Sequence, residues 1–156
     1  MSRRSKPENR EVLPDVRYNN VQVQAFINAM MRNGKKSLAA RLFYDALDMA
    51  EQRVNRSGLE IFEQAIKNIS PLMEVKPRRV GGATYQIPME VPGYRRFALA
   101  SRWILSAAHD RSGRNFSEKL AAELMDAANN TGAAYRKREE THKMAEANRA
   151  FSHYRV

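Results

Sequence analysis

Few residues in this 156-residue chain are arranged for catalysis or for metal binding. His109 is the only histidine beside a carboxylate, Asp110, and the pair lies near a predicted helix end, where a surface histidine and a capping carboxylate are the commoner explanation. The three histidines, at positions 109, 142 and 153, are too scattered for a recognisable metal motif. Gly81-Gly82 lacks the Gly-Lys-Ser/Thr ending of a phosphate loop. The sequence therefore predicts no catalytic residue, no metal site, no cofactor and no enzyme.

Basic side chains offer a different chemistry, the neutralisation of an anionic partner. Lys and Arg number 27 against 17 Asp and Glu, a formal net charge of +10. The excess is concentrated in residues 76–114, which hold only two acidic residues, Glu90 and Asp110. Charge runs are usually only solvated faces, but a sign this consistent favours nucleic acid as the partner, with an anionic membrane surface second. The basic residues of this window are Lys76, Arg78, Arg79, Arg95, Arg96, Arg102, Arg111 and Arg114.

The remaining charges and the apolar residues limit the class of protein. Residues 115–135 carry three carboxylates against one lysine, which predicts an acidic patch within a basic surface. Hydrophobic residues make up 43% of the chain, enough for a single domain over residues 1–156. There is no cysteine, the N-terminal stretch lacks the apolar core of a secretory signal, and no apolar run is long enough to span a bilayer. We therefore expect a soluble, intracellular protein.

The elements that must position these basic residues are mostly helices. Apolar residues recur at helical spacing over 23–31, 38–54 and 59–69. Ser57 and Glu60 have the spacing of a capping box before the third of these helices, and Pro71 follows its end. The same period returns over 97–108, over 117–128 with Phe116 as a hydrophobic staple before an N-cap at Ser117, and from Ala133 onward in a mostly exposed final helix.

Residues 73–91 interrupt the helical period and predict a β-ribbon. From Tyr85 the apolar residues alternate, and Gly81-Gly82 supplies the positive-φ positions of a tight turn. Pro77 and Pro88 cannot donate to a strand ladder, which suits a ribbon that is all edge. The ribbon is either a structural hairpin with incidental charge or a basic arm laid into a groove of nucleic acid.

The two ends of the chain are predicted to be irregular. Residues 1–18 contain two prolines and no helical period, so we expect an extended basic arm. Residues 149–156 form an aromatic and basic tail. Phe151 and Tyr154 suit either stacking on unpaired bases or attachment of the tail to the body of the protein.

Four long segments together resemble one known family. NGKKSLAARLFYDAL (33–47), KPRRVGGATYQIPMEV (76–91), ALASRWILSAA (98–108) and KREETHKMAEANRAFSHYR (137–155) are similar to ribosomal protein seven of the small subunit, in its bacterial or organellar form. The resemblance covers nearly the whole chain in order. It implies a mainly α, single-domain bundle of about six helices, with a two-stranded antiparallel β-ribbon between the third and fourth.

The resemblance also implies a function. Members of this family are structural constituents of the small ribosomal subunit, in a cytoplasmic or organellar ribosome. They are primary binders of the 3′ major domain of small-subunit ribosomal RNA and nucleate assembly of the head. They lie at the subunit interface near the exit-site transfer RNA and the messenger path, beside small-subunit proteins nine and eleven. Bacterial members also repress translation of their own operon messenger.

Carried over residue by residue, the resemblance assigns two sets of contacts. Those with ribosomal RNA would come from Arg3, Arg4, Lys6, Arg10, Lys35, Lys36, Lys76, Arg78, Arg79, Arg95, Arg96, Arg102, Arg111 and Arg114. Those near the exit-site transfer RNA and messenger would come from Arg78, Arg79, Val80, Gly81, Gly82, Tyr85, Lys143, Arg149 and Tyr154.

Two other classes of protein share part of this pattern. A DNA-bending architectural protein also joins a helical body to basic ribbon arms, with a proline near the tip as a wedge. A peripheral membrane protein would need a strong apolar helix face opposite clustered lysines, and the final helix has the charge without that face.

Overall fold

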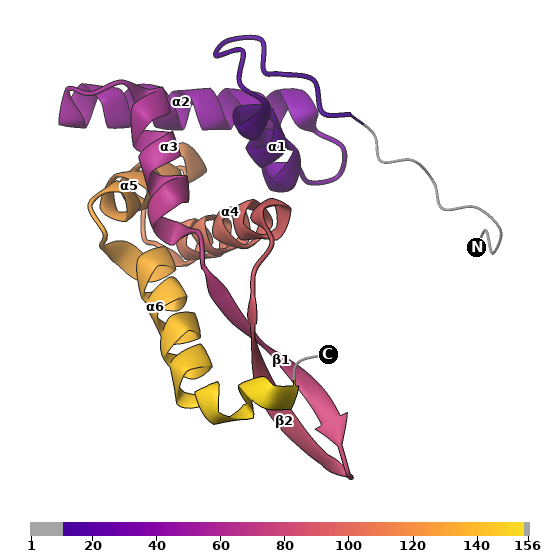
Figure 1. The fold of residues 1–156 in the computed structure, drawn as a ribbon. Coiled ribbons are helices and arrows are strands. Elements are labelled where there is room, and N and C mark those ends of the chain that lie inside the picture. Colours follow the sequence, from indigo (N-terminus) through magenta and orange to yellow (C-terminus); the bar gives the residue numbers. More distant parts are fainter. Residues whose placement is uncertain (1–10, 155–156) are drawn as a thin grey trace, which may run out of the picture.

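The computed structural model describes residues 11–154, apart from the Val80 side chain, and shows a helical body with a projecting β-ribbon (Figure 1). This confirms the predicted fold class, with the ribbon between the third and fourth helices. The elements are α1 (Val21–Met30), α2 (Lys36–Val54), α3 (Gly58–Ile69), β1 (Met73–Val80), β2 (Ala83–Glu90), α4 (Gly93–Asp110), α5 (Phe116–Ala128), α6 (Gly132–Ala147) and the short 3₁₀ helix η1 (Arg149–Tyr154).

The core is built on three phenylalanines from the first three helices. The rings of Phe26 (α1), Phe43 (α2) and Phe62 (α3) are fully buried, and their centroids lie 5.2–5.4 Å apart. Two of the three pairs meet edge to face, the arrangement that aromatic quadrupoles favour. Helix α5 adds Leu120 and Leu124, also fully buried, and contacts α2, α3, α4 and α6. Helix α5 therefore lies at the centre of the bundle.

The start of α3 differs from its predicted cap. Ser57 is the N-cap residue, but its side chain makes no capping hydrogen bond, so the predicted capping box with Glu60 is wrong. The Glu51 carboxylate of α2 instead accepts a hydrogen bond from the Gly58 backbone N–H at 3.1 Å. A side chain from the preceding helix thus satisfies one of the free N–H groups that begin α3.

The start of α5 also differs from the prediction. The helix begins at Phe116 after an N-cap at Asn115, so Ser117 lies inside the helix, where it is 3% exposed. Phe116 packs against the core and lies 4.7 Å from the His109 ring, centroid to centroid. Its apolar side chain thus makes tertiary contacts from within the first turn and is not a staple that precedes the cap.

The described part of the predicted arm is held against α2. The Asp15 carboxylate, 3% exposed, accepts hydrogen bonds from the Tyr44 hydroxyl and from the backbone N–H groups of Arg17 and Tyr18. Arg17 forms an ion pair with Asp48 at 2.5 Å. Burial and the Asp15 hydrogen bond raise the pKa of Tyr44 to about 12. Asp15, Arg17 and Tyr18 therefore attach this part of the arm to the body through contacts that leave no helical or strand period in the sequence.

The ribbon has the predicted turn. Its strands pair antiparallel from Met73↔Glu90 to Val80↔Ala83, and Gly81 and Gly82 have φ values of +57° and +90°. Two consecutive positive φ angles match the two-residue turns that suit the twist of a hairpin. The glycines at the tip are exposed, whereas Ile87, about halfway along the ribbon, is 2% exposed.

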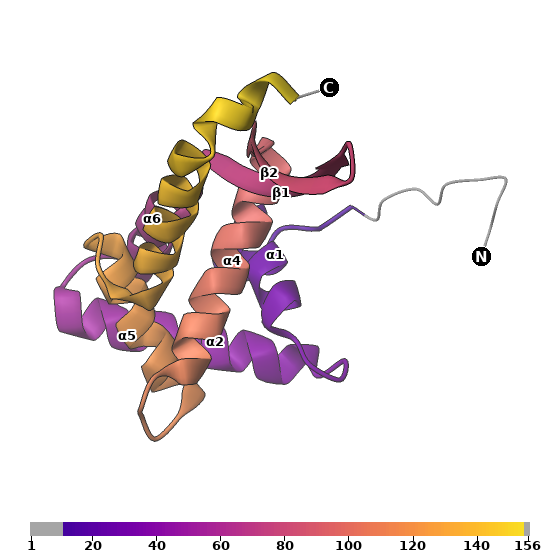
Figure 2. The same ribbon diagram turned by 90° about the horizontal axis from the view of Figure 1, so that it is seen from below.

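Three sets of contacts fix the ribbon to the body. At the root, Arg95 of α4 makes two hydrogen bonds to the Glu74 carboxylate, at 2.8 and 3.0 Å. The His142 Nε2 atom of α6 accepts a hydrogen bond from the Leu72 N–H at 3.0 Å. Further out, η1 lies over the strands (Figure 2), where the Tyr85 ring stacks on Tyr154 at 5.6 Å.

The aromatic tail thus contacts the ribbon. Phe151 also lies against Tyr85, with 5.2 Å between the ring centroids, and the Arg78 guanidinium donates to the Tyr154 carbonyl at 3.2 Å. Of the two interpretations of the tail, the described structure favours internal attachment, although the aromatic rings pack on the ribbon and not on the helical body. An isolated hairpin is marginal in water, so these contacts supply support that the ribbon needs.

The His142 contact predicts a pH dependence of stability. Burial lowers the pKa of His142 and the Arg138 charge lowers it further, with Glu139 opposing. The neutral ring is therefore favoured in the folded state. Its contribution to stability is fully present above about pH 6.5, the pKa of histidine in the unfolded chain. It is lost as the pH falls through the lower pKa of the folded state. We expect His142→Gln, whose amide oxygen can still accept a hydrogen bond, to lose less stability than the wild type between about pH 7.5 and about pH 5. Urea denaturation at both pH values measures this, and equal losses would contradict it.

Candidate nucleic-acid interface

Two adjoining cavities open on one side of the helical body. The first, which we call the α1–α4 groove, has a volume of about 750 Å³ and lies between α1 and α4. Its lining residues are Ala25, Ala29, Met30, Arg32, Phe97, Ala98, Ser101, Arg102, Leu105, Ser106 and His109. The second, the α2–α5 cavity, has a volume of about 490 Å³ and is bounded by the starts of α2 and α5. Met30, Arg32 and His109 line both, so the two form one continuous depression.

The linings of both cavities are basic, and neither includes an aspartate or a glutamate. In the described part of the chain, none of their cationic side chains forms an ion pair with a carboxylate. An unpaired cluster of one sign raises the local positive potential and attracts an anionic partner. The cations of this cluster, which we call the groove cations, are Arg32, Lys35, Arg102, Arg114 and Lys119.

The structure thus brings together three residues that the resemblance assigned to RNA contacts, namely Lys35, Arg102 and Arg114. It adds two cations, Arg32 and Lys119, that the resemblance did not include. Arg32 comes just after the C-cap residue of α1, Met31, and it was not predicted from the sequence because an isolated arginine forms no recognisable pattern. Lys119 was not predicted as a contact because it is the single lysine of the acidic stretch 115–135.

A histidine contact lies where the two cavities meet, since Arg32 and His109 line both of them. Arg32 Nη2 lies 3.1 Å from His109 Nε2. Burial lowers the pKa of His109, and the charge of Arg32 lowers it further. The neutral imidazole can then accept a hydrogen bond from the guanidinium. His109 therefore orients a cation, which is a structural role and not a catalytic one.

The start of α2 adds positive charge to this depression. Lys35 is its N-cap residue and Lys36 its first helical residue, both are exposed, and no acidic residue lies in the first turn. Cations at a helix N-terminus oppose the helix dipole, at a cost of about 0.3–1 kcal/mol each. An anionic partner at this end would remove that cost.

The ribbon carries a second group of exposed cations. Lys76, Arg78 and Arg79 are exposed on β1, and Lys76 lies 3.8 Å from the Glu74 carboxylate at the root. The Arg79 side chain makes no hydrogen bond or ion pair to any other described residue. On α6, Lys143 is exposed, and Arg149 after it lies 3.4 Å from Glu146. The roles assigned to these residues remain predictions.

Two of the predicted RNA contacts on α4 already have partners within the protein. Arg95 is paired with Glu74, whose hydrogen bond and charge raise the pKa of the guanidinium. Arg96 donates to the Val91 carbonyl at 2.7 Å. Both side chains join the start of α4 to the ribbon, so their first role in the structure is to orient it. Of the other predicted contacts, Arg3, Arg4, Lys6 and Arg10 lie outside the described residues.

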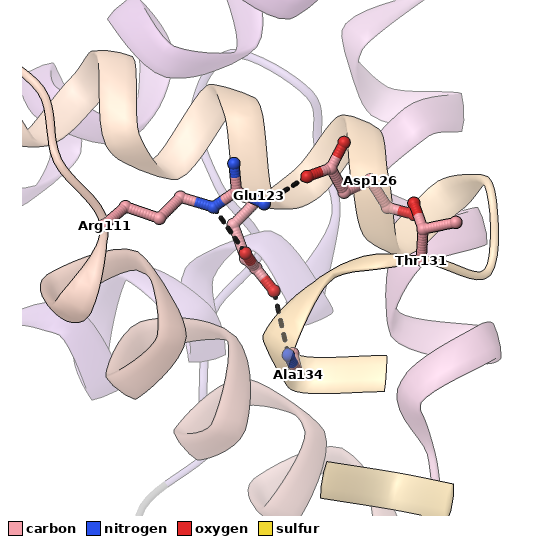
Figure 3. Close-up of polar contacts among 5 residues, drawn as sticks. All are labelled: Arg111, Glu123, Asp126, Thr131 and Ala134. Atoms are coloured by element: carbon pink, nitrogen blue, oxygen red, sulfur yellow. Dashed lines mark hydrogen bonds and ion pairs between the residues drawn. The ribbon is translucent and has the colours of Figure 1, made fainter. Parts of the chain in front are cut away.

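Arg111, another predicted RNA contact, pairs with two carboxylates within the protein (Figure 3). Its Nε atom lies 2.6 Å from Glu123 Oε2, and its Nη2 atom contacts Asp126. Burial opposes the charged guanidinium, but the hydrogen bonds to Asp126 and Glu123 raise the pKa of Arg111 on balance. Glu123 is completely buried, and its Oε1 atom accepts a hydrogen bond from the Ala134 N–H at 2.9 Å. Two of the three carboxylates in the predicted acidic patch therefore face Arg111, and this part of the prediction is wrong.

Neither a metal site nor a membrane-spanning helix is found among residues 11–154. No group of three or more His, Cys, Asp or Glu side chains in this range could hold a metal ion. Within the same range, no helix is long and apolar enough to cross a membrane.

Comparisons with known proteins point to a single family. Residues 2–149 match the sequence profile of the ribosomal protein S7p/S5e family. The small ribosomal subunit protein uS7 of Thermomicrobium roseum is 58% identical over 155 residues, which are 99% of each chain. Proteins of the same name from Chloroflexus aurantiacus and Thermosynechococcus vestitus are 56% and 58% identical, and each match covers 99% of this chain and at least 98% of the relative.

The buried carboxylate of Glu123 provides a test of what holds this part of the fold together. We expect Glu123→Ala to lower the free energy of unfolding by about 3 kcal/mol or more, because it leaves buried partners unsatisfied. Glu118→Ala is the matched control, since Glu118 lies 3.8 Å from Arg53 and both side chains are more than 40% exposed. That surface pair should contribute less than about 1 kcal/mol. Urea denaturation compares the two variants, and equal losses would show that Glu123 has no special role.

Proposed function

The chain belongs to the ribosomal protein S7p/S5e family, and we propose that it binds the 3′ major domain of small-subunit ribosomal RNA and nucleates assembly of the head. Membership makes it a structural, non-enzymatic protein of the small ribosomal subunit, one that binds ribosomal RNA and acts in translation. The finer proposal rests above all on one observation, the groove cations without a carboxylate partner among the described residues.

The physics of such a surface is that of counterion release. Each phosphate neutralised by Lys or Arg releases condensed counterions, so affinity falls steeply with salt, by roughly 10³ to 10⁵ between about 50 and 200 mM on the duplex-DNA calibration. Charge alone does not select an RNA. The major groove of A-form RNA is too narrow for side chains to read, so selection comes from the shape of a folded junction and from unpaired bases. A depression flanked by cations suits that kind of recognition.

The ribbon and the tail support a second part of the proposal. The ribbon projects from the helical body (Figure 1), and its tip glycines and Arg79 are exposed. We propose that one set of residues lies near the exit-site transfer RNA and the messenger path. These residues are Arg78, Arg79, Val80, Gly81, Gly82, Tyr85, Lys143, Arg149 and Tyr154. We further propose small-subunit proteins nine and eleven as neighbours, and repression of the protein's own operon messenger as an additional role.

The ribbon fits the DNA-bending alternative less well. In that class a proline near the tip wedges between base steps. Here Pro77 pairs with Gln86 and Pro88 with Val75, and the turn itself is Gly81-Gly82. Neither proline therefore lies at the tip, where that class places its wedge.

Competition binding tests the main proposal. The purified protein is bound to a labelled transcript of the 3′ major domain, with unlabelled transcript, transfer RNA, duplex DNA and an unrelated structured RNA as competitors at moderate salt. We expect only the unlabelled transcript to compete effectively, because the protein selects a folded RNA shape. Equal competition by duplex DNA would replace the proposed function with the architectural one.

The ribbon assignment has its own test. We expect Arg78→Ala with Arg79→Ala to weaken binding to the transcript and to reduce the salt dependence of log K by about one for each phosphate that the variant no longer neutralises. The matched control, Arg53→Ala with Arg56→Ala, removes the same charge at the junction of α2 and α3, far from the ribbon in Figure 1. Far-UV circular dichroism should show unchanged helix content in both. If the ribbon variant binds like the control, the ribbon does not contact this RNA.

A further inference from the structure

We propose that the α1–α4 groove is a binding site for one unpaired nucleobase of RNA, held between the two helices with its flanking phosphates on the groove cations. The inference rests on the proposed RNA-binding function and adds a ligand class and a position within the interface. On this proposal the groove recognises an unpaired nucleotide, in addition to attracting RNA through its positive potential.

The shape of the groove is the first support. Small side chains line both walls, Ala25 and Ala29 from α1 and Ala98 from α4, and they keep the two helices from filling the space between them. Its volume of about 750 Å³ falls within the range of about 300–1,000 Å³ that is typical of small-molecule sites. Phe97 and Leu105 add larger apolar surface. Such walls suit the flat face of a base, which stacks on apolar and aromatic side chains.

The polar groups of the groove are the second support. Arg32 and Arg102 line it, and neither pairs with a carboxylate in the described part of the chain. Ser101, 1% exposed, lies between the helices, and its hydroxyl has no hydrogen-bond partner among the described residues. Buried polar atoms normally have a partner, and the edge of a base carries both donors and acceptors. Apolar walls, cations and one unsatisfied hydroxyl together match a nucleotide better than they match a phosphate alone.

An unpaired nucleotide is required because paired bases are not available to such a site. In A-form RNA the bases are stacked inside the helix, and sequence-specific recognition targets loops, bulges and ends whose bases can be splayed out. The continuous depression formed with the α2–α5 cavity brings Lys35, Arg114 and Lys119 within the same surface. We assign these cations to the backbone on one side of the inserted base.

The test fills the groove without changing its charge. Ala98 is exposed on α4 and lines the groove, so Ala98→Leu places a larger apolar side chain there at a position that tolerates it in the fold. Ala147→Leu, at an exposed position near the end of α6, is the matched control. Arg102→Ala serves as the charge comparison. Each protein is titrated with the 3′ major domain transcript and with a blunt, fully paired RNA duplex, at several salt concentrations.

We expect Ala98→Leu to bind the transcript about tenfold more weakly than Ala147→Leu, the order of the loss of one stacked base, with an unchanged salt slope and unchanged duplex binding. Arg102→Ala should weaken both RNAs and reduce the slope by about one. Thermal unfolding followed by circular dichroism verifies that all variants are folded.

Two results would overturn the assignment of the groove. If Ala98→Leu binds the transcript like Ala147→Leu, no base enters the groove, and a protein segment becomes the candidate occupant. If it loses affinity equally for transcript and duplex, the groove contacts only the backbone. A wild-type protein without preference for the transcript would instead overturn the proposed function, so the two failures are distinguishable.

Discussion

The buried carboxylate of Glu123 is the contact on which the arrangement of the second half of the chain depends. One oxygen holds Arg111 at the end of α4, and the other holds the Ala134 N–H at the start of α6. Gly132 makes this approach possible, because its φ is +93° and a Cβ there would lie 3.0 Å from Glu123 Oε1. Burying a charge is costly unless it is paired and hydrogen-bonded. Three helices are thus fixed at one point, and α6 in turn orients the ribbon through His142.

The cations of this protein divide into two groups with different roles. Arg17, Arg95 and Arg111 each pair with a carboxylate and join elements that are distant in the sequence. The groove cations have no such partner in the described residues and lie around one depression. A net charge of +10 therefore does not describe a uniformly basic surface. Internal pairing engages carboxylates elsewhere in the protein and leaves one face positive, which favours association with a polyanion.

The ribbon, η1 and α6 are joined to one another by contacts. A two-stranded ribbon has open edges and is marginal without support, and here Glu74, Tyr85 and Leu72 provide contacts to α4, η1 and α6 in turn. Stacking of Tyr85 with the tail uses aromatic surface that could otherwise have met bases. The basic side chains of β1 and the glycine tip thus stay exposed, while Tyr85 joins the ribbon to η1.

The sequence by itself determined the elements and their order. The helical period of apolar residues, the alternation after Tyr85 and the Gly81-Gly82 turn each depend on neighbours within a few positions, and the resemblance in four long segments supplied the family. Only the tertiary structure decided which charged side chains have a partner of opposite charge within the described part of the protein. Arg95 and Arg111 carry the same guanidinium as Arg102, yet Glu74 and Glu123, 21 and 12 positions away, bind the first two, whereas Arg102 has no carboxylate partner among the described residues. The capping of α3 by Glu51 and the place of Ser117 inside α5 were likewise set by contacts between helices. The physical reason is common to all of them: periodicity is a local property of the chain, whereas the pairing and burial of a polar group are decided by what folds against it.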